Sequence, residues 1–238
     1  MIQALSNPQK FMAFSRWAAP IIGLIAAVLL SWGLYLAFTV PDDYQQGQTV
    51  RLLFIHPQVA IMSMFAYACL GGASFFGLVF RHALADAAAR AAAPLGAAFT
   101  FLALFTGALW GRPMWGKFWV WDARLTSELV LLLIYLGYMA LQAAIDDEAK
   151  ANRAAAILAL IGLINLPIIH YSVNWWNTLH QGNANFLKND VAPVYQLPFA
   201  LTLFGFMALF GSLWLVRTRA EVWRRRAGAL AVQAAGRA

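Results

Sequence analysis

Charged residues are absent from six long stretches of the chain, and this pattern sets the expected fold. The windows without Asp, Glu, Lys or Arg are 17–41, 52–80, 91–111, 129–145, 154–187 and 191–216. A helix needs about 20 apolar residues to cross the hydrocarbon core of a bilayer, so each window holds one crossing. The pattern predicts one all-α transmembrane domain over 1–238, with no separate soluble domain. Its six helices are expected at 18–40, 57–80, 92–109, 126–144, 154–173 and 196–216.

The positive charges are distributed unevenly between the segments that join these helices. Both termini and the 81–90 and 146–153 loops carry twelve of the 17 lysines and arginines: Lys10, Arg16, Arg81, Arg90, Lys150, Arg153, Arg217, Arg219, Arg224, Arg225, Arg226 and Arg237. The opposite side carries Arg51, Arg112, Lys117, Arg124 and Lys188. Positive residues concentrate on the cytoplasmic side, so both termini are predicted to be cytoplasmic. The net charge of +7 comes largely from this cytoplasmic side, where positive residues set the topology and attract anionic lipid. No nucleic-acid-binding motif accompanies the charge.

Proline and capping residues mark several expected helix ends. The residue before proline avoids the helical region whereas proline suits the first helical turn, so His56-Pro57 predicts the start of the second helix. Gly111 and Pro113 are expected to end the third helix before the tryptophans, leaving 110–128 as an outer loop. Asp122 or Thr126 is the expected cap of the fourth helix, and Pro167 predicts a kink in the fifth.

The stretch Trp110–Glu128 holds four of the ten tryptophans and five charged residues, between segments almost free of charge. An aromatic belt at the membrane interface is one explanation of the rings. Such a belt does not explain three tryptophans within seven loop residues beside Arg112, Lys117 and Arg124. Aromatic area combined with fixed positive charge favours a platform for a flat, apolar ligand with anionic arms.

Two of the four histidines, His56 and His180, are expected on the same outer side as this stretch. Imidazoles are the commonest axial ligands of haem iron, so the pair predicts a haem site. His170 lies close below and is expected to bond to backbone freed by Pro167, and His82 is expected in a cytoplasmic loop. Arg51, Arg112, Lys117 and Arg124 are the candidate partners of the haem propionates.

Several classes of function find no support in the residues. There is no Cys-x-x-Cys-His motif for a covalently attached haem, no nucleophile–base motif and no phosphate-binding loop, and the single Cys69 cannot form an internal disulfide.

A di-haem cytochrome b-like quinol oxidoreductase is the alternative from the enzyme class. It would need histidine pairs within helices, and only His170 falls within one. A solute channel would need charges inside the membrane, which the six windows lack.

The motif Trp115-Gly116-x-x-Trp119-x-Trp121-Asp122-x-Arg124-Leu125-Thr126 resembles the tryptophan-rich (WWD) signature of the membrane proteins that handle haem in cytochrome c maturation. Together with His56-Pro57 and Trp175-Trp176-Asn177-Thr178-Leu179-His180-Gln181-Gly182, it resembles the haem exporter protein C (CcmC) family over nearly the whole chain. The resemblance implies a multi-pass protein of the bacterial inner membrane with its haem platform on the periplasmic face.

The resemblance also implies the site and its partners. Haem b is bound as cargo, with His56 and His180 as axial ligands of the iron. The other haem-binding residues implied are Trp115, Trp119, Trp121, Asp122, Arg124, Trp175 and Trp176. The expected partners are a periplasmic haem chaperone, the ATPase and membrane subunits of an ABC transporter, a small single-helix membrane subunit and the lipid bilayer. The chain itself is expected to be a haem-delivery component and no enzyme, able at most to promote covalent haem attachment to the chaperone.

Overall fold

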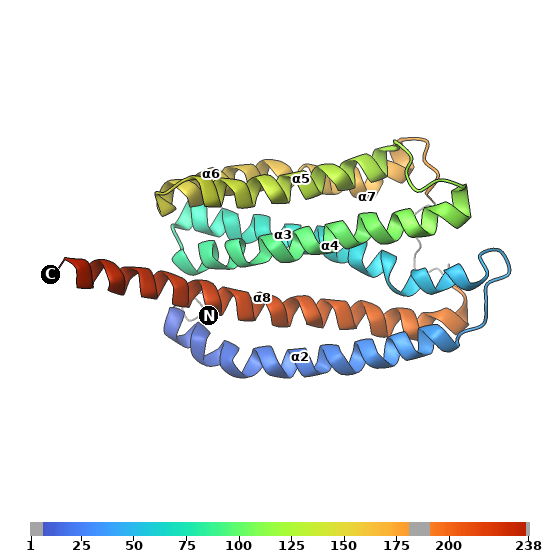
Figure 1. Cartoon of the computed structure of the whole chain (residues 1–238), viewed down its shortest axis with the longest axis horizontal. Helices are drawn as coiled ribbons and strands as arrows, with labels where there is room; N and C mark the ends of the chain where they lie inside the picture. Colours follow the sequence, from blue (N-terminus) through green and yellow to red (C-terminus); the bar gives the residue numbers. More distant parts are fainter. Residues whose placement is uncertain (1–6, 181–190, 237–238) are drawn as a thin grey trace.

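The computed structural model describes residues 7–180 and 191–236, and these form a bundle of long helices (Figure 1). In chain order the elements are α2 (Pro8–Thr39), the short 3-10 helix η1 (Gln48–Phe54), α3 (His56–Phe80), α4 (Ala83–Trp115), α5 (Ala123–Ala144), α6 (Glu148–Gly162), α7 (Asn165–Trp175) and α8 (Pro193–Ala235). Among the described residues, six helical segments are long and apolar enough to cross a membrane, with α6 and α7 together forming the fifth. The predicted all-α fold with six spans is confirmed.

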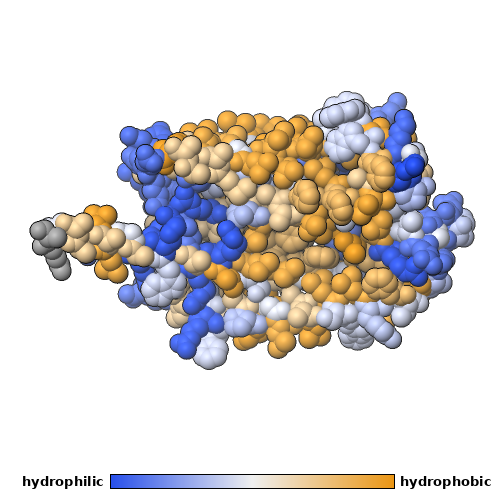
Figure 2. Space-filling model, in the orientation of Figure 1, coloured by the Kyte–Doolittle hydropathy of each residue, from blue (hydrophilic) through white to orange (hydrophobic). Residues whose placement is uncertain are grey.

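The surface of the bundle is divided into an apolar belt and two polar ends (Figure 2). Large apolar side chains in the belt face outward, among them Leu24 (68% exposed), Phe38 (70%) and Phe204 (58%). Apolar area on this scale is unfavourable in water and is satisfied by lipid. Residues 116–122 connect α4 to α5 at one end, here called the tryptophan end. At the other, the basic end, α2 begins and α8 finishes (Figure 1).

The helices extend beyond the apolar windows from which they were predicted. α2 begins at Pro8 and not near residue 18, because Asn7 caps it by accepting a hydrogen bond from the Gln9 backbone N–H. α4 begins at Ala83 and not near residue 92, and α8 runs on from the predicted 196–216 to Ala235. A charge-free window measures the part of a helix that lies in hydrocarbon. It does not locate the end of the backbone hydrogen bonding.

The predicted break at Gly111 and Pro113 is wrong. α4 continues through both residues to Trp115, and it ends where Gly116 adopts a positive φ of 74° and donates its N–H to the Arg112 carbonyl. Glycine occupies this left-handed conformation at little steric cost, which makes it the common helix terminator. Residues 110–128 are therefore not one loop. They comprise the last turns of α4, the connection 116–122 and the first turns of α5.

Other predicted helix ends agree with the structure. α3 begins at His56, and Asp122 is the cap of α5, accepting a hydrogen bond from the Leu125 N–H at 2.8 Å. The fifth span is interrupted between Gly162 and Asn165. Pro167 explains this bend, because it has no N–H to donate to the Leu163 carbonyl and its ring crowds that group.

Two buried tyrosines organise the centre of the bundle. The rings of Tyr67 on α3 and Tyr135 on α5 meet edge to face with centroids 5.0 Å apart. Tyr135 donates a hydrogen bond to the Ser63 carbonyl at 2.9 Å, and it packs directly against Gly96 of α4. This core joins α3, α4 and α5, while α2 packs mainly along α8.

A Cβ atom added at Gly96 would overlap the hydroxyl and the ring of Tyr135. We therefore expect Gly96→Ala to lower the free energy of unfolding by about 1–3 kcal/mol, the usual effect of overpacking a core. Thermal unfolding in detergent measures this. Gly72→Ala, on the exposed side of α3 with nothing within 4 Å of its Cβ position, is the control and should be neutral or stabilising. Equal effects of the two changes would contradict this description of the core.

Candidate functional site

A cavity of about 440 Å³ opens near the tryptophan end, with walls supplied by α3, α4, α5, α7, α8 and the segment after α7. Its volume lies in the range of small-molecule and cofactor sites. Seven of its lining residues have an imidazole, indole, guanidinium or carboxylate side chain suited to binding or orienting a ligand: His56, Trp110, Trp115, Arg124, Glu128, His170 and His180. The two histidines predicted from the sequence are thus brought to one cavity, although they are more than 120 residues apart in the chain.

The orientation of His56 is set by α4. Its Nδ1 lies 3.1 Å from the Thr106 hydroxyl oxygen, and that hydroxyl donates its own proton to the Leu102 carbonyl at 2.7 Å. The hydroxyl must therefore accept from an Nδ1–H, which places the lone pair of the imidazole on Nε2. Trp110 packs edge to face against the His56 ring with centroids 5.7 Å apart.

The orientation of His180 is set by Asp122. The His180 Nδ1 lies 2.9 Å from Oδ2 of Asp122, and the same oxygen accepts a hydrogen bond from the Thr178 hydroxyl. Asp122 is only 8% exposed, and its other oxygen caps α5. A carboxylate that accepts the Nδ1 proton fixes the ring and leaves Nε2 as the donor atom for a metal.

The ionisation states at this pair follow from their surroundings. Burial by itself raises the pKa of Asp122. The hydrogen bonds from Thr178 and the Leu125 N–H, together with His180, outweigh burial and hold that pKa below its usual range. Burial lowers the pKa of His180 despite the attraction of Asp122. The pair at pH 7 is therefore an ionised carboxylate and a neutral imidazole, the form in which histidine binds a metal.

Aromatic and charged groups complete the cavity. Trp115 lies edge to face against His180, with centroids 4.8 Å apart, so each histidine has one tryptophan of α4 against its ring. Arg124, on the first turn of α5, supplies a positive charge, and its charge interacts with those of Glu128 and Asp122. Glu128 is buried and accepts a hydrogen bond from Ser63 at 2.6 Å.

The other basic candidates lie outside the cavity wall. Arg51 pairs with Asp42 at 3.3 Å, and Arg112 donates to the Gly116 carbonyl and lies over the Phe118 ring. Lys117 is exposed. Lys188, also expected on this side, is outside the described residues, as are Gln181 and Gly182 of the signature and Arg237 of the tail.

The remaining predicted tryptophans form two pairs at the tryptophan end, outside the cavity wall. Trp119 and Trp121 meet edge to face at 5.3 Å, and Trp175 and Trp176 do so at 5.8 Å. None of the four lines the cavity, and Trp121 is 76% exposed. Their part in haem binding, like that of every predicted site residue, remains a prediction. Trp110, by contrast, lines the cavity although it was not among the predicted contacts.

The cavity fits a haem in several independent respects. It offers two imidazoles with oriented Nε2 atoms, two tryptophan rings and one guanidinium. Two donors at the same end of the bundle, Trp119 Nε1 and Arg51 Nε, are buried without a partner in the described part of the chain, although neither lines the cavity. Residues 7–180 and 191–236 contain no cluster of three side chains able to hold a bare metal ion. Iron in a porphyrin needs only one or two protein ligands.

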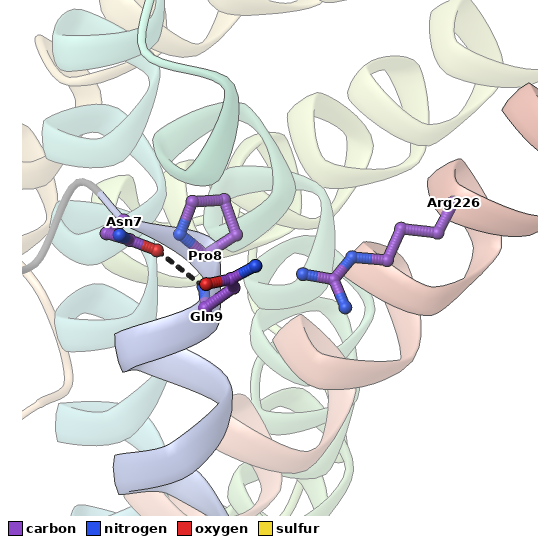
Figure 3. A pocket seen from close by; sticks show the side chains of 4 residues that line it. All are labelled: Asn7, Pro8, Gln9 and Arg226. Carbon is purple, nitrogen blue, oxygen red and sulfur yellow. Dashed lines mark hydrogen bonds between the residues drawn. The ribbon is translucent and has the colours of Figure 1, made fainter.

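A second hollow lies at the basic end and has a different character. It is open and shallow, lined by Asn7, Pro8, Gln9 and Arg226 (Figure 3). The polar groups drawn there are largely explained by the cap of α2, in which Asn7 accepts from the Gln9 N–H. It holds no aromatic ring and no histidine, so the cavity at the tryptophan end is the better candidate site.

Known proteins resemble this chain over nearly its whole length. The family model described as Heme exporter protein C matches residues 1–233. The Heme exporter protein C of Bradyrhizobium diazoefficiens is 51% identical, covering 98% of this chain and 89% of that protein. Its counterpart in Escherichia coli K12 is 48% identical (92% and 89% covered), and that of Paracoccus denitrificans is 43% identical (94% and 95% covered). With its six apolar helices, this is a multi-pass protein of the bacterial inner membrane. The chain belongs to the Heme exporter protein C family.

Proposed function

We propose that the cavity binds haem b as cargo and presents it, at the periplasmic face of the membrane, to a periplasmic haem chaperone. Family membership gives the broader role, which is haem export and delivery for cytochrome c biogenesis. One observation carries the finer proposal. His56 and His180 line a single cavity, and each has its Nδ1 hydrogen-bonded so that its Nε2 bears the lone pair.

Each part of the site then has a task. The two Nε2 atoms take the axial positions of the iron, and Asp122 and Thr106 hold the rings in place. Trp110 and Trp115 cover the two imidazoles and offer apolar area to the macrocycle. Arg124 pairs with a propionate through charge-assisted hydrogen bonds. Trp119, Trp121, Trp175 and Trp176 provide the outer platform, from which the haem edge remains accessible to the chaperone.

The proposed orientation rests on charge. Arg90, Glu148, Glu221, Arg224 and Arg225 form an ion-pair network at the basic end, where the arginines outnumber the glutamates. Excess positive charge favours the cytoplasm, so both termini are assigned there and the tryptophan end to the periplasm. The apolar belt contacts lipid.

The family role also bears on partners and on catalysis. The family description names an exporter, which supports a role in transport, and we expect the chain to work with an ABC transporter and not to act as an enzyme itself. We assign this chain four protein partners beyond haem and lipid: the transporter's ATPase subunit, its membrane subunit, a small single-helix subunit and the chaperone. Its contribution to covalent attachment is to hold haem in reach of the chaperone's own nucleophile.

The di-haem cytochrome b-like alternative is not favoured. It requires histidine pairs stacked across the bilayer, whereas His56, His170 and His180 all line the cavity near the tryptophan end. His82 instead caps α4 at the basic end, where its Nδ1 accepts the Ala85 N–H.

The test of presentation is covalent haem on the chaperone, detected by haem staining after denaturing electrophoresis. Cells that make this chain with its transporter and chaperone should give a stained chaperone. Arg124→Ala should reduce the stain, because a propionate loses its partner, which costs about 1.5–3 kcal/mol. Arg112→Ala, the same change outside the cavity, is the control. An unstained chaperone beside haem-loaded wild-type protein would overturn the presentation step.

A further inference from the structure

The seam between α3 and the fifth span is closed on the basic half of the bundle. Tyr67 of α3 donates a hydrogen bond to the Ala159 carbonyl of α6 at 3.0 Å, and Leu163 packs directly over Gly71. Past the bend at 163–164 the arrangement changes, because α7 packs chiefly on α5. In Figure 1, α3 runs toward α8 at its tryptophan end while α7 stays in the layer of α5. The two helices therefore separate on this half.

The cavity reaches the outer surface of the bundle at this seam. Several residues that line it are covered, among them Phe199 (5% exposed), Ala103 (2%) and Leu125 (7%), whereas Leu179, in the segment after α7, is 50% exposed at the tryptophan end. Ile61 of α3 lines the same cavity and yet is 40% exposed. His170 of α7 also lines it and is exposed. Ile61 and His170 thus mark a side opening of the cavity.

The position of Ile61 on its helix shows what the opening faces. The exposed residues of α3 follow one helical stripe: Ile61, Phe65, Ala68, Gly72, Phe75, Phe76, Val79 and Phe80. This stripe belongs to the apolar belt, so it faces lipid. Ile61 is five residues from the start of α3, and His170 is five residues from the end of α7. At 1.5 Å per residue, both lie roughly 7–8 Å inside the bundle from these helix ends, level with the hydrocarbon of the nearer leaflet.

We infer that haem moves between this leaflet and the cavity sideways, through the opening between α3 and α7 marked by Ile61 and His170. The inference rests on the proposed function, since haem is its occupant. A flat, largely apolar macrocycle partitions into the bilayer, and the opening admits it edge first. The sequence places two features there: Pro167, which bends the fifth span away from α3, and an imidazole at the threshold.

The test is the rate of haem loading. Apo protein in lipid nanodiscs is mixed with phosphatidylcholine–phosphatidylglycerol vesicles containing haemin, and the Soret band is followed by stopped flow. Ile61→Trp should slow loading roughly tenfold, the effect of about 1.4 kcal/mol on the barrier. The control is Val130→Trp, at a similar depth on α5, where Val130 is 39% exposed and does not line the cavity. It should load at the wild-type rate. Equal rates for the two variants would overturn the side opening.

A reversible block covers the case in which the Ile61→Trp protein does not fold. In a Cys69→Ser background, Ile61→Cys is modified with a bulky methanethiosulfonate before haemin is added. Loading should be slow, and it should recover when a phosphine reductant removes the group. Val130→Cys treated alike should be unaffected, and unhindered loading of the modified Ile61→Cys protein contradicts the inference.

The two proposals fail in different ways. Haem spectra that are unchanged in both His56→Ala and His180→Ala would remove the binding site itself. Normal loading past a blocked Ile61, with the spectra altered in the histidine variants, would remove only the side opening.

Discussion

Replacing His180 or His56 with alanine is expected to empty the site or to change the coordination of its haem. Wild-type protein purified from membranes should carry sub-stoichiometric, six-coordinate haem, because two imidazoles line the cavity with Nε2 available. Removal of a residue that orients a metal ligand typically lowers affinity by about 10–100-fold. Loss of an axial ligand itself should lower haem affinity at least as much, so the purified variants should retain less haem. Haem content and the position of the Soret band measure both outcomes.

His82→Ala is the matched control for these variants. It removes the same side chain from the opposite end of the bundle, where His82 caps α4 and has no part in the cavity. A small loss of stability is expected, with an unchanged haem spectrum. Free imidazole added to His56→Ala or His180→Ala should restore a six-coordinate spectrum, since the small ligand can occupy the vacated position. If His82→Ala and His180→Ala behave alike, the effect is one of folding and not of ligation.

Asp122→Asn is expected to weaken haem binding while α5 stays capped. Asp122 accepts the Nδ1 proton of His180 through one oxygen and caps α5 through the other. Asparagine is an equally good cap, so helix stability should change little. It lacks the negative charge that fixes and polarises the imidazole, and removal of such a partner typically costs about 10–100-fold in affinity. Haem titration followed by absorbance, with thermal unfolding in parallel, separates the two effects.

Asp122→Ala should lose both functions, with lower haem affinity and a lower unfolding temperature. Asp147→Ala is the control, because Asp147 caps α6 through the Ala149 and Lys150 N–H groups and lies outside the cavity. It should leave haem affinity at the wild-type value. Wild-type affinity in Asp122→Asn would show that His180 does not depend on this carboxylate.

Much of the fold could be predicted from the sequence because its determinants are local. The number of spans follows from the absence of charge over lengths that cross a bilayer. His56-Pro57, Pro167 and the cap at Asp122 act through their own backbone or that of the next turn, so their effects appear where they were predicted. The prediction at Gly111 and Pro113 failed because the local signal does not decide there: both residues are tolerated in a helix whose neighbours hold it in place.

The composition of the cavity wall could be predicted less well. The sequence placed His56, His180, Trp115 and Arg124 on one side of the membrane, and all four line the cavity. It could not distinguish Trp110, which lines the cavity, from Trp121, which is exposed outside it, because that depends on where α4 ends. Thr106, which orients His56, and Phe199 of α8 reach the site only through helix packing, and neither carries a local signal.

Electron paramagnetic resonance of the ferric haem in the purified protein tests axial ligation by His56 and His180 most directly. Two imidazole ligands should give a low-spin signal in the wild-type protein and in His82→Ala. His56→Ala and His180→Ala should each show high-spin haem or none. A high-spin signal in the wild-type protein, or a low-spin signal that persists in both single variants, would contradict the assignment.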